Sequence, residues 1–208
     1  PSTTLFRSWS TGFFTRGYSS FQFAIIPLAG DPVVICRDVE EYYLDATCVF
    51  PGRVLWTDSD DRDAVGAKAI RDALGPKARV GIELRAWPLS AGRFAALREA
   101  LPETTFVDVS ATTARLRFVK SPAEIAWQRL AAKAAEAGMA AGIAAAIEGA
   151  SERDVAADVC AAMIRAGSDL PGPGVLSSGE RAYHLHGGYA DRILERGDVV
   201  QLEVTPNV

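Results

Sequence analysis

LRFVKSPAEI, residues 116–125, contains the strongest local signal in the sequence. Ser121, Pro122 and Glu124 are typical of a helix start. The serine hydroxyl can accept the third helical N–H, the glutamate can reach back, and proline suits the first helical position. An alanine-rich segment follows, so we predict one long helix that ends near Glu148. Its small side chains should let a neighbouring backbone or sheet approach closely.

A domain boundary falls at this helix start, which separates residues 1–119 from residues 120–208. Upstream of it, apolar strand-like runs alternate with helical periodicity. Strands that alternate with helices predict a three-layer α/β first domain. The first two runs are joined by a turn signal and predict a hairpin. The strand-like runs are 21–28, 33–36, 53–56, 80–84 and 105–109, and the helical segments are 63–74 and 89–101.

Shorter elements follow the long helix. The segment from Ser151 to Asp154 predicts the start of a second helix, which Gly167 closes. A loop rich in proline and glycine at 171–174 then leads to short strands at 175–178 and 199–204. The second domain therefore begins with two helices and continues into strands.

Composition narrows the class of protein. The 208 residues are 49% hydrophobic and 23% charged, with a net charge of −4. These values allow sizeable cores and indicate neither nucleic acid nor a membrane surface as partner. No run is long and apolar enough to span a bilayer. The odd number and wide spacing of Cys36, Cys48 and Cys160 fit neither a disulfide scaffold nor a zinc motif, and they favour a reducing, cytoplasmic compartment.

Four segments form an ordered set along the chain. They are Ser10–Phe13, Leu116–Ile125, Gly149–Val155, and Ser178-Gly179 followed by His186 and Gly197–Val200. Together they resemble the family of creatinase, prolidase and aminopeptidase P, in which a strand ending in Lys-Ser enters the first helix of the second domain. The resemblance implies a creatinase-type N-terminal domain at 1–119, with its start missing. It implies that 120–208 is the first part of an α+β catalytic domain of the pita-bread fold.

The resemblance also bears on metal. Peptidases of this family use two divalent metals (Mn, Co or Zn), and their first aspartate ligand lies in a D-x-G strand. Glu203 occupies that place here, with Thr205 where the glycine is usual. The extra methylene moves the carboxylate by about a bond length, so Glu203 is a doubtful metal ligand. Creatinase needs no such metals, and ectoine hydrolase also departs from the peptidase pattern. Because Pro206 keeps the proline of the creatinase N-x-x-P strand, both metal states stay open.

His186 is the candidate catalytic residue. It lies 11 positions before Gly197, as the active-site histidine does in the family it resembles. Neutral imidazole near pH 7 can take a proton and return it to a leaving nitrogen. Read without the resemblance, His186 is more simply a loop histidine bonded to backbone. His184 and Tyr189 are candidates for substrate binding, and His184 would share a face with His186 in an extended segment. Arg181 and Tyr183 could line a pocket or merely its rim.

The resemblance implies a hydrolase that cleaves a C–N bond (peptide, amide or amidine) in a small molecule or dipeptide. The alternative is a non-catalytic pita-bread binding protein, because this fold also hosts a histone chaperone and ribosome-associated growth factors. A binding module is expected to lose the histidine and to carry a charged docking surface. The resemblance further implies a homodimer, for which the aromatic candidates are Trp9, Phe13, Phe14 and Tyr18.

Overall fold

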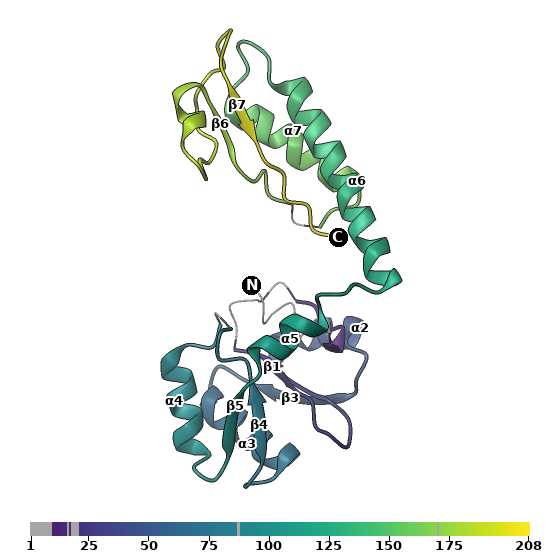
Figure 1. Ribbon diagram of the computed structural model, residues 1–208, viewed down its shortest axis with the longest axis vertical. Helices are drawn as coiled ribbons and strands as arrows, with labels where there is room; N and C mark the ends of the chain where they lie inside the picture. The colour runs from purple at the N-terminus through teal and green to yellow at the C-terminus, as the bar shows by residue number, and fades with distance from the viewer. Residues whose placement is uncertain (1–9, 16, 18–20, 87, 170) are drawn as a thin grey trace. The chain divides into compact units, whose positions relative to one another are not determined.

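The structure is a computed structural model that describes residues 10–15, 17, 21–86, 88–169 and 171–208. The chain divides into two compact units, Pro1–Val119 and Lys120–Val208, and Figure 1 labels most of their helices and strands. The interface candidates Trp9 and Tyr18 lie outside the described residues.

The first unit is built on two small sheets. The predicted hairpin is present, because β1 pairs antiparallel with β2, and β2 pairs parallel with β3. β4 and β5 form a second, parallel pair. The parallel pairs require crossover connections, and helices supply them. The strands are β1 (Phe23–Ile25), β2 (Val33–Arg37), β3 (Gly52–Trp56), β4 (Arg79–Ile82) and β5 (Thr105–Asp108).

The helices of this unit include two that the sequence predicted and others that it did not. α3 begins where the Asp61 side chain accepts the backbone N–H groups of Asp63 and Ala64, and Ser90 caps α4 in the same way. The short η1, α2 and α5 were not predicted. The helices are η1 (Asp38–Glu40), α2 (Glu41–Thr47), α3 (Arg62–Leu74), α4 (Ala91–Ala100) and α5 (Ser110–Leu116).

One expectation from the family resemblance is wrong at the junction. The resemblance implied a strand that ends in Lys-Ser, but α5 runs to Leu116. The chain then turns, because the Phe118 N–H donates to the carbonyl of Arg115 at 3.1 Å. Local hydrogen bonds of this kind replace the strand ladder immediately before Lys120.

Strand β2 shows why the first unit has three layers. Ile35 packs in one cluster with Ile70 of α3 and Leu97 of α4. Val34 and Cys36 point to the other face and pack with Leu44 of α2 and with Phe13. Alternate residues of a strand face opposite sides of the sheet, so β2 is covered on both faces. The predicted α/β fold class is confirmed.

The dimer expectation needs one correction here. Phe13 is fully buried inside the first unit, so its side chain is not available to a partner. Phe14, the next residue, is 39% exposed. Alternation along the chain turns one aromatic ring into the core and the other toward solvent.

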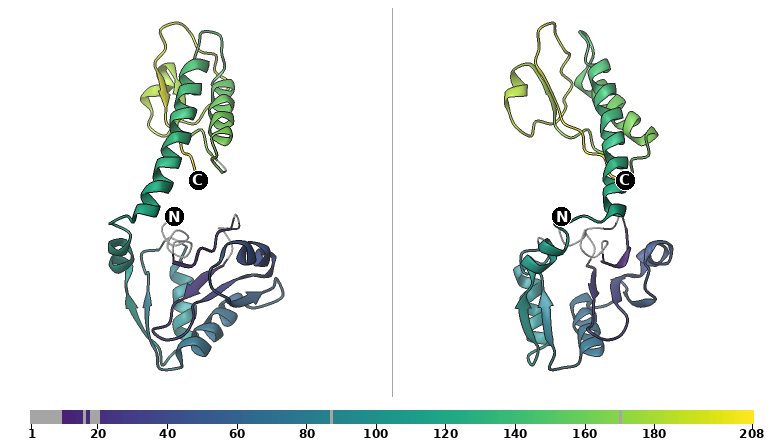
Figure 2. Two further views of the ribbon diagram at one scale, coloured as in Figure 1. Left: turned by 90° about the vertical axis from the view of Figure 1, so that its right-hand side faces the viewer. Right: turned by 45° about the vertical axis from the view of Figure 1, so that its right-hand side comes forward.

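The second unit begins with α6 (Pro122–Ala145) and α7 (Glu152–Arg165), which pack side by side (Figure 1 and Figure 2). The predicted helix start is confirmed: Ser121 Oγ accepts the Glu124 N–H at 3.2 Å, and the Glu124 carboxylate accepts the Ser121 N–H at 2.7 Å. Small residues let the helices approach closely. A Cβ at Gly138 would lie 2.6 Å from Met163 Cγ.

Strands β6 (Leu176–Ser178) and β7 (Val200–Leu202) complete the described part of this unit. They pair antiparallel, and Leu176 packs against Val155, Val159 and Met163 of α7. The helix η2 (Gly179–Tyr183) follows β6 directly. None of the described helices is long and apolar enough to cross a membrane.

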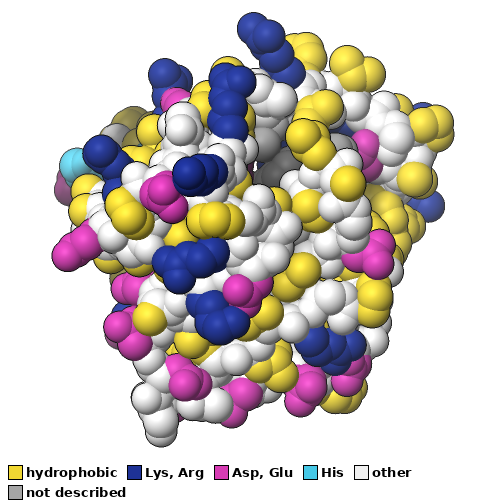
Figure 3. Space-filling view, turned by 90° about the horizontal axis from the view of Figure 1, so that it is seen from below, with side chains coloured by type: hydrophobic (Ala, Val, Ile, Leu, Met, Phe, Trp, Pro, Cys, Tyr) yellow, Lys and Arg dark blue, Asp and Glu magenta, His cyan; other side chains and the backbone are white. Residues whose placement is uncertain are grey.

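Charges of both signs are mixed on the surface, as the sequence indicated. On the face drawn in Figure 3, basic and acidic side chains lie interspersed among apolar ones. This face therefore lacks the single-sign charged area that a docking module would present.

Candidate active site

The joint between β6 and η2 needs a glycine. Gly179 has φ +58°, in the left-handed region that favours glycine. A Cβ at this position would lie 2.5 Å from Arg192 Nη2. The chain can therefore leave β6 sharply and enter the segment that carries His184 and His186.

A buried carboxylate lies behind this segment. Glu152, the first residue of α7, has a fully buried side chain. Its Oε1 accepts the N–H and the hydroxyl of Ser178, at 2.8 and 2.7 Å. Its Oε2 accepts the Ala190 N–H at 2.7 Å and is paired with the Arg181 guanidinium. One side chain thus joins α7, the end of β6, η2 and the residues that follow His186.

Glu152 is held in its charged form. Burial by itself raises the pKa of Glu152, but the hydrogen bonds from Ser178, Arg181 and the Ala190 N–H outweigh it and hold the pKa below its usual range. Hydrogen bonds to the ionised form act in this direction. Glu152 is therefore a fixed anion at neutral pH and carries no proton to donate.

A second ion pair closes the turn before β7. Arg192 donates to both carboxylate oxygens of Asp198, at 3.0 Å to Oδ1, and to the Ser178 hydroxyl at 2.9 Å. Asp198 also accepts the Glu195 N–H at 2.8 Å. The hydrogen bond from Arg192, with the one from Glu195, lowers the pKa of Asp198. The Gly197-Asp198 motif therefore shapes the backbone here.

His186 has an unusual backbone conformation. With φ +63° it is, among the described residues, the one non-glycine residue at positive φ. Such a conformation costs about 1–2 kcal/mol and is found at sites where surrounding contacts fix it. Its side chain is exposed.

The backbone on either side of His186 is anchored. The Leu176 N–H of β6 donates to the Gly187 carbonyl at 3.1 Å, and Arg181 Nη2 donates to the Gly188 carbonyl at 2.6 Å. A Cβ on Gly187 would lie 3.0 Å from Ser177 Oγ. Because a backbone N–H of a strand lies in the plane of its sheet, the bond from Leu176 places Gly187 along the edge of β6 that does not pair with β7.

The condition under which His184 and His186 would share a face, an extended segment, is not met. The His184 N–H donates to the Arg181 carbonyl at 3.1 Å, and a bend at His184 leads into a turn at residues 185–186. Because the segment is not extended, alternation does not place the two imidazoles on one face. His184 is exposed, as His186 is.

The other expected binding residues have structural partners. Arg153 Cζ lies 5.6 Å from the centroid of the Tyr189 ring, and Arg153 also pairs with Asp191. Arg181 donates hydrogen bonds to the Glu152 carboxylate and to the Gly188 carbonyl. Tyr183 is exposed. Tyr189 and Arg181 are thus held in place by contacts within the unit.

Glu203, the doubtful metal ligand, follows β7 with an exposed side chain. Its N–H donates to the Val175 carbonyl at 2.8 Å, and its own carbonyl lies so close to Gly174 that no Cβ would fit there. Within the described ranges, no group of three or more His, Cys, Asp and Glu side chains could hold a metal ion. The described residues therefore do not by themselves fit the two-metal centre of the peptidases.

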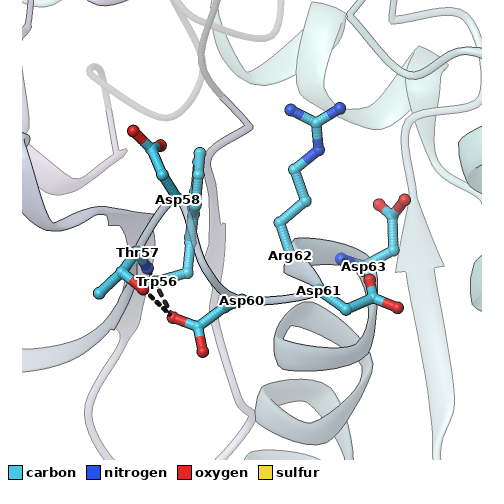
Figure 4. Close-up of a pocket in the computed structure, with 7 residues that line it drawn as sticks. All are labelled: Trp56, Thr57, Asp58, Asp60, Asp61, Arg62 and Asp63. Carbon is cyan, nitrogen blue, oxygen red and sulfur yellow. Dashed lines mark hydrogen bonds between the residues drawn. The ribbon is translucent and has the colours of Figure 1, made fainter.

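A hollow of about 300 Å³ lies in the first unit, between β3 and α3 (Figure 4). Its carboxylates are engaged locally. Asp60 accepts the N–H and the hydroxyl of Thr57, both at 2.7 Å, which lowers the pKa of Asp60. Asp61 caps α3, and Asp63 Oδ1 lies 3.3 Å from Arg93 Nε. These acidic residues form a turn and a helix start, and nothing at the hollow indicates a ligand.

Glu152 was missed from the sequence, where it was interpreted only as part of a helix start. One signal could have found it. A capping box needs an acid at the third helical position, which Asp154 supplies, with its N–H 3.1 Å from Ser151 Oγ. Glu152 is a further acidic residue, at the first helical position, and the capping box does not require it.

Similarity to known proteins covers both units. Residues 6–119 match the creatinase/prolidase N-terminal domain, and residues 126–208 match metallopeptidase family M24. An uncharacterized hydrolase/peptidase of Sinorhizobium fredii is 30% identical over an alignment of 166 residues, and the match covers 76% of this chain and 42% of that protein.

Solved structures show the same fold. An Xaa-Pro dipeptidase from Bacillus anthracis has a TM-score of 0.77 at 20% identity, covering 97% of this chain and 54% of that one. A prolidase from Thermococcus sibiricus has a TM-score of 0.77 at 24% identity, covering 96% and 54%. An X-Pro aminopeptidase from Thermotoga maritima has a TM-score of 0.74 at 19% identity, covering 97% and 54%. The chain thus spans about half the length of the proteins that it matches.

Proposed function

The chain belongs to the family of the creatinase/prolidase N-terminal domain, with a segment of the M24 metallopeptidase type after it, and we propose that the whole protein is a hydrolase of a C–N bond in a small substrate. The substrate is a dipeptide or a small amide or amidine. The observation that carries the proposal is His186, an exposed imidazole on a left-handed turn whose flanks are anchored to β6 and to Arg181.

In this proposal His186 is the general acid/base. For a peptide or amide it takes a proton from water as the water oxygen bonds to the carbonyl carbon. It then returns that proton to the nitrogen as the C–N bond breaks, which leaves a carboxylic acid and an amine. Imidazole suits both steps because its unperturbed pKa of about 6.5 lies near neutral pH. Such a group contributes roughly 10²–10⁴-fold to the rate.

The proposal has two versions, which differ in whether the enzyme requires a two-metal site. Members of the M24 family generally use divalent metals. Glu203 in place of the first aspartate favours an enzyme whose site differs from the standard two-metal one, as in creatinase. We therefore propose that Glu203 does not complete that site.

Two measurements on the full-length protein test this function. The first is release of amine from a panel of Xaa-Pro dipeptides, other small amides and creatine. Turnover of any of these substrates supports a hydrolase, and binding without turnover across the panel favours the non-catalytic alternative. The second is metal content with chelation. Two equivalents of Mn, Co or Zn, with activity lost on chelation, would make Glu203 an unusual ligand and put the Xaa-Pro peptidase first.

A further inference from the structure

We infer that Glu152 is a positioning residue: through Arg181 and the Ala190 N–H, its buried carboxylate holds the turn that carries His186 in its working geometry. The inference rests on the proposed function, in which His186 acts on the substrate. Glu152 itself touches no reacting atom. Its effect reaches the chemistry only through the segment that it clamps.

The first step concerns what a buried carboxylate requires. An ionised group away from water is unfavourable unless its acceptor sites are filled. Glu152 is fully buried and accepts from the Ser178 N–H, the Ser178 hydroxyl, the Arg181 guanidinium and the Ala190 N–H. An apolar side chain would fill this space without any of these bonds. The choice of a carboxylate therefore points to a requirement for its hydrogen bonds.

The second step concerns where the donors lie. Arg181 precedes His186 by 5 positions and Ala190 follows it by 4. Both bind Glu152 Oε2, so the two flanks of the segment meet at one oxygen atom. The second arm of Arg181 reaches the Gly188 carbonyl at 2.6 Å. A left-handed conformation such as that of His186 persists where surrounding contacts over-determine it, and this clamp supplies such contacts.

The third step separates positioning from general stability. The start of α7 is capped by Ser151 and Asp154, through bonds of 3.1 and 3.4 Å that do not involve Glu152. The apolar side of α7 packs independently, through Val155 and Val159. Loss of the Glu152 charge should therefore loosen the segment that carries His186 before it unfolds the helix.

The test uses full-length Glu152→Gln, with Asp154→Asn as the matched control in the same turn of α7. Hydrogen–deuterium exchange of peptides covering 182–190 is the readout that does not require activity. We expect at least tenfold faster exchange in Glu152→Gln, with the rest of α7 unchanged, and wild-type exchange of 182–190 in Asp154→Asn. On a substrate that the enzyme turns over, kcat should fall roughly 10–100-fold with little change in KM, because misplacement of about 1 Å costs about 10²-fold.

Unchanged exchange and unchanged kcat in Glu152→Gln would overturn the inference. If Glu152→Gln does not fold, Arg181→Gln decides, because it keeps the bonds that Ser178 and Ala190 donate to Glu152 and removes only the two that Arg181 makes, to Glu152 and to the Gly188 carbonyl. Faster exchange and lower kcat in Arg181→Gln support positioning, and wild-type values there would reduce Glu152 to a structural role. A wild-type kcat in His186→Ala would instead contradict the proposed function. The exchange measurement on Glu152→Gln does not depend on that result, because it requires no activity.

Discussion

Replacing Gly179 with alanine adds one methyl group at the joint between β6 and η2, and the structure sets its effect. At φ +58° an L-residue is about 1–2 kcal/mol less stable than glycine. The new Cβ would also lie 2.5 Å from Arg192 Nη2 and 3.1 Å from Asp198 Oδ1. The guanidinium must therefore move.

Moving Arg192 weakens its bonds to Asp198 and Ser178. Hydrogen bonds to charged groups contribute about 1.5–3 kcal/mol when well buried. The side chains of Arg192 and Asp198 are 27% and 13% exposed, so solvent screening reduces this contribution. The lost bonds should cost about 1–2 kcal/mol and the backbone strain about 1–2 kcal/mol more, so Gly179→Ala should lower the free energy of unfolding by about 2–4 kcal/mol.

Two other glycines separate the contributions. Gly197→Ala introduces strain alone, because φ is +93° and a Cβ there meets nothing within 4 Å, so it should cost about 1–2 kcal/mol. Gly188→Ala has open space and no positive φ, and should change stability by less than about 0.5 kcal/mol. Urea unfolding of the full-length variants measures all three. Equal losses of stability in Gly179→Ala and Gly197→Ala would show that the contact with Arg192 costs nothing. Equal values in all three variants would show that the positive φ costs nothing either.

Further predictions concern packing, pH and assembly. Gly138→Ala should destabilise, because a Cβ 2.6 Å from Met163 Cγ overpacks the α6–α7 contact by about 1–3 kcal/mol and exceeds the gain in helix propensity of about 1 kcal/mol. Gly92→Ala, with nothing within 4 Å, should instead raise the melting temperature. The lowered pKa values of Glu152 and Asp198 mean that their stabilisation is complete above about pH 4.5 and is lost as the pH falls through the lower native pKa values. The urea midpoint should therefore decrease as the pH is lowered below about 4.5, and it should decrease less steeply in Glu152→Gln than in the wild type. The full-length protein should be a homodimer by light scattering at micromolar concentration, and a monomeric mass would contradict this.

Local signals accounted for much of the fold. The start of α6 was predicted from Ser121, Pro122 and Glu124, because a capping box involves only neighbours in the chain. α2 and α5 were missed because each has only seven residues, too few to show a helical period, and tertiary contacts such as the burial of Leu44 support α2.

The site was harder to predict for a physical reason. Glu152 binds Ser178 and Ala190, which are 26 and 38 residues away along the chain. No pattern near residue 152 records those partners, so a charged side chain in a helix start is expected to be exposed. The turn at His186 likewise depends on hydrogen bonds from β6 and Arg181, so the alternation expected of an extended segment does not apply there.

The central claim is that His186 moves the proton during C–N cleavage, and the kcat of His186→Ala tests it most directly. The measurement uses the full-length protein and the best substrate of the panel, with His184→Ala as the neighbouring control. We predict a fall in kcat of roughly 10²–10⁴-fold for His186→Ala with a smaller change in KM, and a smaller fall in kcat for His184→Ala. A kcat for His186→Ala within about twofold of wild type, in a folded variant, would contradict the account.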